Sequence, residues 1–537
     1  MKYEKLFQPG KIGNLELRNR VVMTAMGALM GDWNGCTTPE QIRFYEDRAK
    51  GGCGLITVHS AQGATKVDKI DPYPGSIRVD DNMYVPMLSD LAEAIHRYGA
   101  KCTINISPGG GAQSLGFPYD KGSQGVYNVT RIAPGTLQSR FVGAPVRPMT
   151  VEEIHTMVDC MGWSCFNAKR AGFDAVTIHA IGGYLISEFL TPWFNNRTDE
   201  YGGSLENRYR VLHEIIENIQ AKCGKDFPII VRMSIDEYLG DAGRGVEESK
   251  ILCQWMERDG VAAIDAEAAV FETVEWMIPT IYQPKATLAH LAAAIKEAVS
   301  IPVFAQGRMF DPEVAEQVLA DGQADFISES REWIVEPDFV TKLEKGDVEG
   351  IRRCINCNYC IGKRIFGQMP LRCTFNPIAG RESRFPNGKV GKAEEKKRVA
   401  IIGGQIEGLQ GAVFLRKRGR EVTVLEPSET FGKGIPPRYL DRLKPWLAKK
   451  DVQLLGGVTC DQITDQGVVI TTKDKQRKLI EADTVMVLLS QEPDTSLLEA
   501  LKGSVKEVLC AGSVNGAQVG SLIVNAIEDG RRIGCNL

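Results

Sequence analysis

Four cysteines lie close together in the sequence, and their spacing suits an inorganic cluster. Cys354, Cys357 and Cys360 fall within seven residues, and Cys373 follows after twelve intervening residues. Three closely spaced thiolates can take three corners of an iron–sulfur cube, and a distant fourth closes it. Zinc sites more often use two separated pairs of ligands. The spacing therefore predicts a [4Fe–4S] cluster, with zinc or free thiols as the alternatives.

Two arginine-containing turns could bind a phosphate. Gly307 and Arg308 follow one short apolar run, and Ser330 and Arg331 follow the next. A β/α barrel commonly binds a phosphate with the loops after its seventh and eighth strands. Glycine lets the backbone come close, and arginine forms a charge-assisted pair with phosphate. We expect a phosphate site here; two surface arginines are the alternative.

A turn in the last part of the chain is typical of a nucleotide-binding loop, with changes. An apolar run ends at Gly403, and Gly408 follows five residues later. A dinucleotide site favours G-x-G-x-x-G, whose middle glycine lets the backbone approach the pyrophosphate. Gln405 stands at that place, and Glu407 adds negative charge where phosphates bind. Glu426, ending the next predicted strand, suits a ribose hydroxyl and favours NAD over NADP. An NAD(H) site and a structural or docking role both stay open.

The elements that must position these residues alternate regularly over the first 345 positions. Amphipathic stretches, such as 151–169 and 208–222, separate short apolar runs. Eight β–α units predict a closed (β/α)8 TIM barrel, with an open doubly wound sheet as the alternative. The eight runs predicted as strands are 21–25, 55–59, 102–106, 175–179, 228–233, 262–265, 302–305 and 325–328.

The fold class is α/β, with further parts after the barrel. We expect the barrel over 1–345, an iron–sulfur segment over 346–385, a basic linker over 386–398, and a Rossmann-like α/β domain over 399–537. In that last domain a strand, a helix and a second strand open a βαβ unit. The Gly/Pro/Ser-rich stretch 107–149 is expected to be a long loop at the catalytic face of the barrel.

Composition excludes several classes of protein. The chain has 537 residues, 43% of them hydrophobic and 25% charged, as in globular proteins. The net charge of −4 offers no basic surface for nucleic acid. We see no secretory signal and no run long enough for a membrane span. We therefore expect a cytoplasmic protein, and we also expect an oligomer, of one or two chain types.

Several stretches together resemble the old yellow enzyme family. They are LFQPGKIGNLELRNR at 6–20, HAIGGYLISEFLTP at 179–192, NRTDEYGGSLENRYR at 196–210 and PVFAQGR at 302–308. The cysteine spacing and the tail are similar to the branch of 2,4-dienoyl-CoA reductase, 2-enoate reductase and trimethylamine dehydrogenase. This resemblance covers nearly the whole chain. It implies FMN in the barrel, a [4Fe–4S] cluster beside it, and a nucleotide-binding region that feeds or drains electrons.

The resemblance also assigns residues to the flavin. Ala25 and Met26 would line it, and Arg232 would face its N1/O2 edge, where a cation stabilises the reduced form. Asn105 stands where the family usually has a longer glutamine. By resemblance, the two arginine turns described above contact the FMN phosphate.

The substrate-binding pair of the family is only half present. His179 matches its first member, Gly182 replaces the second, and Tyr184 matches the tyrosine that gives a proton to Cα. Hydride delivery to Cβ builds negative charge on the substrate carbonyl, which needs hydrogen-bond donors. The missing donor implies another contact or a different substrate. A strand-end histidine and a packing tyrosine are the structural alternatives.

Two further departures concern cofactors. Gly27 stands where trimethylamine dehydrogenase-like enzymes attach the flavin to a cysteine, so we expect non-covalent FMN. The sequence Ala511-Gly512-Ser513 replaces the family's Gly-Asp motif, and we expect no FAD.

These observations lead to one function and two alternatives. We expect an FMN- and [4Fe–4S]-dependent enzyme that reduces the activated C=C bond of an enoate, enoyl-CoA or enone with hydride from flavin N5. The alternatives are oxidation by an amine dehydrogenase or demethylase, and an electron-transfer subunit of a larger complex. The partners would be a small-molecule substrate and, because the pyridine-nucleotide fingerprint is altered, an electron-transfer protein.

Overall fold

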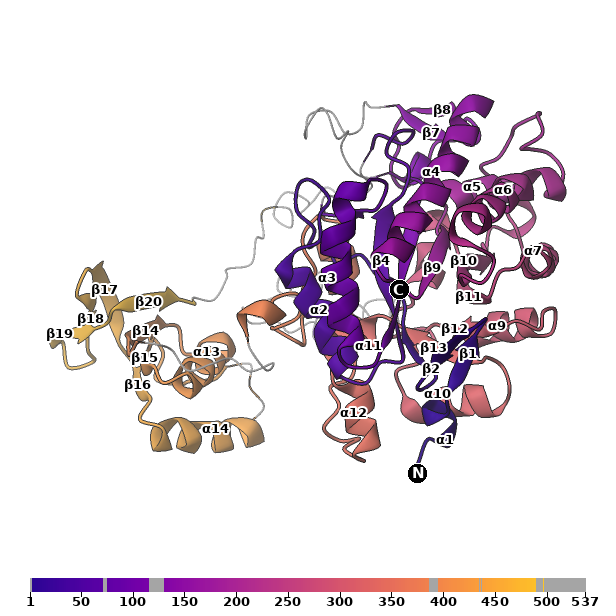
Figure 1. Ribbon diagram of the computed structural model, residues 1–537. Helices are drawn as coiled ribbons and strands as arrows, with labels where there is room; N and C mark the ends of the chain where they lie inside the picture. The colour runs from indigo at the N-terminus through magenta and orange to yellow at the C-terminus, as the bar shows by residue number, and fades with distance from the viewer. Residues whose placement is uncertain are drawn as a thin grey trace, which may run out of the picture. The chain divides into compact units, whose positions relative to one another are not determined.

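A computed structural model describes residues 2–70, 75–114, 130–385, 395–433, 435, 437–488 and 496. The chain divides into two compact units, Met1–Gly388 and Lys389–Leu537, which are described separately below (Figure 1). No helix in these described ranges combines the length and apolar composition needed to cross a bilayer.

The first unit contains a closed barrel of eight parallel strands. In chain order they are β3 (Val21–Met23), β4 (Leu55–Gln62), β6 (Lys101–Ser107), β9 (Ala175–Ala180), β10 (Ile229–Asp236), β11 (Ala263–Ala268), β12 (Val303–Ala305) and β13 (Phe326–Glu329). Each strand pairs with its neighbours in chain order, and β3 pairs with both β4 and β13. The predicted barrel is therefore confirmed, and all eight predicted strands are present. A short strand, β5 (Ile77–Arg78), extends the sheet beside β4.

The register of the strands brings chemically active residues together. Arg232 on β10 pairs with His179 on β9 and with Asp265 on β11. Because all eight strands are parallel, their carboxyl ends meet at one mouth, which is where barrels place their active sites. At the opposite end a hairpin, β1 (Gly10–Ile12) and β2 (Leu15–Leu17), packs against Phe304 and Phe326 and closes the barrel floor.

Helices follow most strands and cover the barrel (Figure 1). Thr150 and Glu153 form a reciprocal capping box at the start of α4, and Ser204 caps α6. The main covering helices are α2 (Pro39–Lys50), α3 (Val85–His96), α4 (Val151–Arg170), α6 (Leu205–Cys223), α7 (Val246–Arg258), α9 (Ala289–Lys296), α10 (Pro312–Ala320), α11 (Arg331–Val335) and α12 (Phe339–Glu344). Shorter helices are α1 (Glu4–Phe7), α5 (Leu185–Leu190) and α8 (Val274–Met277).

The stretch 107–149 is not a loop throughout. Its described part contains two short parallel strands, β7 (Arg131–Ala133) and β8 (Val146–Pro148). Two buried carboxylates hold the glycine-rich turn that precedes them. Asp68 accepts the Gly110 N–H at 3.0 Å, and Glu188 accepts the Ala112 N–H at 2.8 Å. A Cβ at Gly111 would lie 2.2 Å from the Glu188 carboxylate, so a side chain cannot replace this glycine without rearrangement.

The cysteine-bearing segment packs onto the barrel as part of the first unit. It contains a π-helical stretch, Tyr359–Ile365, and a short turn of helix, Glu382–Arg384. Glu382 forms a buried ion pair of 2.7 Å with Arg48 on α2. This pair fastens the end of the segment to the helical layer.

The second unit begins as a nucleotide-binding βαβ unit does. Strand β14 (Arg398–Ile402), helix α13 (Ile406–Lys417) and strand β15 (Glu421–Glu426) follow in that order, as predicted. A parallel sheet runs in the order β16 (Gln453–Gly456), β15, β14, β20 (Thr484–Val487). Helix α14 (Pro437–Lys449) precedes β16. The strands β17 (Thr459–Thr464), β18 (Gly467–Thr471) and β19 (Arg477–Glu481) form an antiparallel sheet. The segment 511–513, on which the expectation of no FAD rests, lies outside the described residues.

Candidate active site

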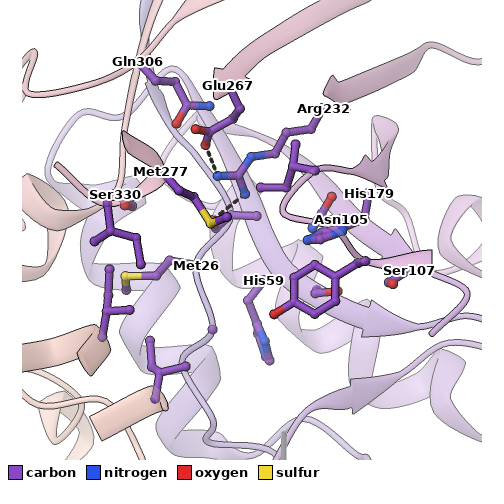
Figure 2. A pocket seen from close by; sticks show the side chains of 18 of the residues that line it. Met26, His59, Asn105, Ser107, His179, Arg232, Glu267, Met277, Gln306 and Ser330 are labelled. Atoms are coloured by element: carbon purple, nitrogen blue, oxygen red, sulfur yellow. Dashed lines mark hydrogen bonds and ion pairs between the residues drawn. The ribbon is translucent and has the colours of Figure 1, made fainter. Parts of the chain in front are cut away.

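A pocket of about 1160 Å³, open solvent at its mouth included, lies at the carboxyl ends of the barrel strands. It gathers nine of the residues that the sequence singled out, and Figure 2 shows part of this arrangement. These nine residues are Ala25, Met26, Asn105, His179, Tyr184, Arg232, Gly307, Ser330 and Arg331. Gly27 also lines the pocket and brings no thiol to it.

The polar floor of the pocket is built around Arg232. Its guanidinium donates to the Ala25 carbonyl at 2.7 Å and to the Glu267 carboxylate (Figure 2). Asp265 lies 3.6 Å from Nε of the same arginine, and burial raises the Asp265 pKa to about 6. Gln306 and Thr24 both donate to Asp265. At least one neighbouring carboxylate therefore balances the positive charge of the Arg232 guanidinium.

Several polar atoms in the pocket have no hydrogen-bond partner among the described residues. They include both amide atoms of Asn105, Nε2 of His59 and Nδ1 of His179, and all three residues are buried. An unpaired buried polar group costs about 1–3 kcal/mol, so such groups normally meet a ligand or water. A flavin ring, with its alternating carbonyl and N–H groups, suits these unpaired atoms.

His179 and Tyr184 lie side by side on the wall of the pocket. Their ring centroids are 4.9 Å apart, and the Tyr184 ring meets Phe271 edge-on at 5.3 Å. Burial lowers the His179 pKa to about 3, with a further contribution from Arg232. The imidazole is therefore neutral near pH 7 and can act as a hydrogen-bond donor or acceptor without a charge.

Gly182, which stands where the family has its second donor, offers only backbone atoms at that position. Gly182 has φ of +72° and its carbonyl accepts the Phe271 N–H at 3.2 Å. A Cβ at this position would lie 3.3 Å from Met277 and 3.4 Å from the Tyr184 ring. Because the left-handed backbone suits glycine, the structure explains the residue but offers no second donor from it.

The sequence did not single out several residues that line this pocket. His59 lies within β4 and is buried, and burial lowers its pKa to about 4. Glu267 and Gln306 complete the polar floor, and a group of apolar side chains, called the apolar wall below, also lines the pocket. That wall consists of Phe271, Met277, Ile361, Ile365 and Phe366. In the sequence, these residues show only an alternation along strands and along a short helix. That alternation does not tell which cavity each side chain faces.

The two arginine turns meet at one side of the pocket. Arg331 donates to the Pro279 carbonyl at 2.7 Å and to Asn358 at 2.6 Å. Arg308 donates to the Ile281 carbonyl at 3.0 Å, and its buried Nε has no partner among the described residues. Gly307 and Ser330 line the pocket directly, whereas Arg308 does not line it. Their phosphate contacts remain a prediction.

The four cysteines of the motif line a single small cavity of about 320 Å³, open solvent at its mouth included. Arg331 lines it too, and thus reaches both cavities. The Asn356 N–H lies 3.5 Å from Cys354 Sγ, and the Phe375 N–H lies 3.3 Å from Cys373 Sγ. Backbone N–H groups directed at sulfur are what cluster-bound thiolates need. The donor set and the cavity fit a [4Fe–4S] cluster, and zinc remains the alternative.

The nucleotide fingerprint lies in the second unit. A Cβ at Gly408 would lie 1.8 Å from the Gly403 carbonyl, so close packing of helix on strand requires this glycine. Glu426 accepts the Gly404 N–H at 2.6 Å and the Ser428 N–H at 3.0 Å. The Glu426 carboxylate is thus held next to the turn, where a ribose hydroxyl could reach it.

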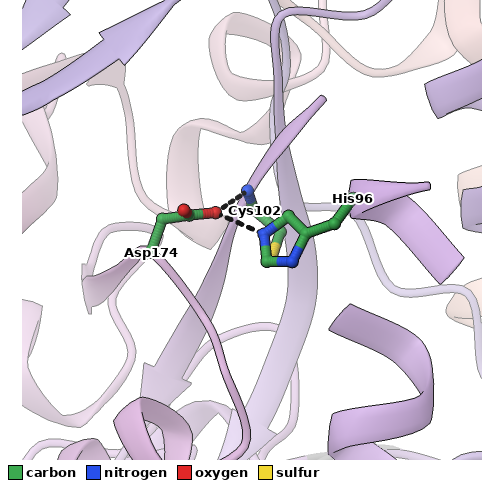
Figure 3. Close-up of side chains that lie close together, drawn as sticks. All are labelled: His96, Cys102 and Asp174. Atoms are coloured by element: carbon green, nitrogen blue, oxygen red, sulfur yellow. Dashed lines mark hydrogen bonds and ion pairs between the residues drawn. The ribbon is translucent and has the colours of Figure 1, made fainter. Parts of the chain in front are cut away.

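A second group of potential metal ligands lies at the amino ends of β6 and β9 (Figure 3). Asp174 lies 2.6 Å from His96 Nε2 and accepts the Cys102 N–H at 2.9 Å and the Lys101 ammonium at 3.1 Å. The carboxylate is already satisfied, and the ammonium disfavours a bound cation. This group therefore joins α3, β6 and β9 as a structural link.

Comparisons with known proteins cover both units. Residues 5–349 match the model of the NADH:flavin oxidoreductase / NADH oxidase family, and residues 378–508 match that of the pyridine nucleotide-disulphide oxidoreductases. Of the two roles left open for the second unit, the second match agrees, at the level of the family, with an NAD(H) site.

Individual proteins resemble the chain over most of its length. An NADH oxidase of Thermoanaerobacter brockii is 34% identical over 527 residues, which cover 94% of this chain and 75% of that protein. A cinnamate reductase of Clostridium sporogenes is 30% identical over 516 residues, 93% of this chain and 76% of that protein. The solved structure of 2-naphthoyl-CoA reductase with 2-naphthoyl-CoA has a TM-score of 0.68 at 24% identity, covers 100% of both chains, and supports the fold.

Proposed function

Because the chain belongs to the NADH:flavin oxidoreductase / NADH oxidase family, and to the old yellow enzyme and 2-enoate reductase-like branch within it, we propose that this flavin-dependent oxidoreductase reduces the activated C=C bond of an enoate, enoyl-CoA or enone. The observation that carries the proposal is the pocket at the barrel mouth. It combines unpaired polar atoms suited to a flavin with the His179–Tyr184 pair.

The flavin would be held without a covalent bond. Asn105 and Arg232 would contact its polar edge, and Ala25 and Met26 would lie against the ring. Arg331 and the turn at Gly307 would hold the phosphate. When bound, FMN supplies hydride from N5 and accepts electrons one or two at a time. We propose these contacts on the support of the unpaired atoms and the lining of the pocket.

The protein's own contribution is to bind and polarise the substrate. His179, as a neutral imidazole, would donate a hydrogen bond to the substrate carbonyl oxygen, where negative charge develops. Tyr184 would give a proton to Cα. The backbone at Gly182 supplies no second side-chain donor, so we expect a backbone N–H or a water to complete the site. The apolar wall that includes Phe271 favours a flat, weakly polar substrate.

The cysteine segment would hold a [4Fe–4S] cluster next to the flavin pocket. The π-helical stretch that starts at Tyr359 includes Cys360 and also carries Ile361 and Ile365 into the pocket wall. A cluster there would pass single electrons and connect the two-electron chemistry of the barrel with a one-electron donor. We propose the division 1–345, 346–385, 386–398 and 399–537 for barrel, cluster segment, linker and second α/β domain.

Anaerobic flavin kinetics test the proposal. The purified protein, with its flavin reduced by light, is mixed with cinnamate, crotonyl-CoA or cyclohexenone, and the return of flavin absorbance is followed. Saturated analogues serve as ligand controls. We expect rapid reoxidation by at least one unsaturated compound and none by its saturated analogue. Uniformly slow reoxidation by all three would contradict the proposal.

The same protein distinguishes the alternatives. Reduction of oxidised flavin by secondary or tertiary amines would favour an amine dehydrogenase or demethylase. The absence of a second side-chain donor at Gly182 also favours this alternative. Reduction by NADH alone would assign the second unit as the electron entry site. Slow reduction by NADH, with fast reduction by a low-potential iron–sulfur or flavin protein, would support a protein donor.

A further inference from the structure

The turn after β12 has the backbone geometry of an anion site. Gly307 and Arg308 both have left-handed φ values, +94° and +61°. A turn of the backbone can direct successive N–H groups toward one concavity, where anions bind. This turn and the end of β13 are the two places where a barrel binds phosphate.

A carboxylate of the chain itself occupies this concavity. Glu329, the last residue of β13, is 8% exposed and accepts a hydrogen bond from the Met309 N–H. Its carboxylate also interacts with the Ser330 N–H. The two N–H groups come from the turns after β12 and after β13, so one carboxylate joins both halves of the expected phosphate site.

The charges around Glu329 fit an anion in this place. Arg331 interacts favourably with it from α11, and Arg308 does so from the turn after β12. Glu267 on β11 and Glu332 on α11 lie close enough to oppose its charge. Burial also raises the Glu329 pKa above its usual range. A phosphate brought to the same N–H groups would meet a second negative charge there.

We propose that the Glu329 carboxylate occupies the anion site of the barrel, so that it competes with the FMN phosphate and brings the affinity for FMN close to that for an unphosphorylated flavin. The inference rests on the flavin site proposed above. Binding of FMN would require Glu329 to leave the Met309 N–H, whereas binding of riboflavin would not. Glu329 thus removes the advantage that the phosphate would give FMN over riboflavin.

The test compares two flavins on the full chain after its flavin has been removed. FMN and riboflavin are titrated by flavin fluorescence into the wild type, Glu329→Gln and Glu329→Leu. The glutamine keeps the shape and removes the charge, and the leucine removes both the charge and the hydrogen bond. Glu313→Gln, on the exposed surface of α10, is the matched control.

We expect both Glu329 variants to bind FMN about ten- to a hundredfold more tightly than the wild type does. This factor corresponds to one charged hydrogen bond of the Glu329 carboxylate, which FMN no longer has to displace. Riboflavin affinity and the control should not change. An unchanged ratio of FMN to riboflavin affinity in both variants would overturn the inference. So would an equal shift for both flavins, which would indicate a general change in the pocket. Absence of binding of either flavin to every variant would refute the flavin site itself.

Discussion

Removing the Glu382 carboxylate should destabilise the first unit substantially. Glu382 pairs with Arg48 at 2.7 Å, and the two side chains are 2% and 0% exposed. Arg48 also donates to the Phe44 and Trp333 carbonyls and lies 3.5 Å above the Phe44 ring, so it cannot leave when its partner is lost. Glu382→Ala therefore leaves a buried cation without its ion-pair partner.

Loss of one member of a buried ion pair costs about 3–5 kcal/mol. With an unfolding entropy of about 2.1 cal/mol/K per residue, a unit of 388 residues should then melt about 4–6 °C lower. Flavin fluorescence released on heating measures this, since the pocket belongs to the first unit. Scans must share one heating rate, because large chains often unfold irreversibly. The same variant should lose iron more readily, since the pair holds the segment that carries Cys373.

Two controls make the reasoning refutable. Glu313→Ala breaks an exposed pair with Lys2, in which the side chains are 69% and 67% exposed, and should change the midpoint by less than about 1 °C. The double variant Arg48→Met with Glu382→Leu should be more stable than Glu382→Leu alone, because it leaves no buried charge. If the double variant is no more stable than Glu382→Leu, the unpaired buried charge is not the cause of the destabilisation, and the prediction is refuted.

Three further predictions concern the pocket. Tyr184→Phe should slow flavin reoxidation by an unsaturated substrate about 10²–10⁴-fold with flavin binding unchanged, and the exposed Tyr282→Phe should not, as stopped-flow absorbance would report. Glu267→Gln should raise the flavin midpoint potential by roughly 30 mV, because the guanidinium beside it loses its counter-charge; an unchanged potential in a spectroscopic titration would contradict this. Burial lowers the His59 pKa to about 4, below the usual 6.5, so the unfolded chain takes up a proton that the folded chain refuses. As the pH decreases from 6.5, the free energy of unfolding of the wild type should therefore decrease by up to about 1.4 kcal/mol per pH unit because of this group. The free energy of unfolding of His59→Gln should decrease less steeply. Melting temperatures that decrease equally in both proteins between pH 7 and 5 would contradict this prediction.

Sequence reasoning predicted the barrel because its signals are local. Buried parallel strands appear as continuous apolar runs, and all eight were found within a few residues of their observed bounds. The pocket residues Asn105, His179 and Arg232 could be predicted because they lie near the carboxyl ends of the predicted strands, which parallel strands bring to one mouth. The stretch 107–149 was harder, since β7 and β8 are too short to show a pattern.

What sequence could not show is which partner each charged side chain finds. Glu267 and Glu329 look like ordinary acidic residues, and only the strand register brings one beside Arg232 and the other onto the Met309 N–H. In the sequence, Gly109–Gly111 belong to the Gly/Pro/Ser-rich stretch that is expected to be a loop. In the structure Gly111 makes room for the buried Glu188 carboxylate, which accepts the next N–H.

The stretch from Tyr359 to Ile365 takes part in both cavities: Cys360 points into one, and Ile361 and Ile365 form a wall of the other. Damage to the sulfur-lined cavity would therefore also open the catalytic chamber to water. With the proposed [4Fe–4S] cluster in the sulfur-lined cavity, a cell that runs short of iron, or meets oxygen, would hold barrels with an incomplete wall rather than active enzyme lacking only its electron supply. Maturation of the metal centre would then act as the last step in building the catalytic chamber.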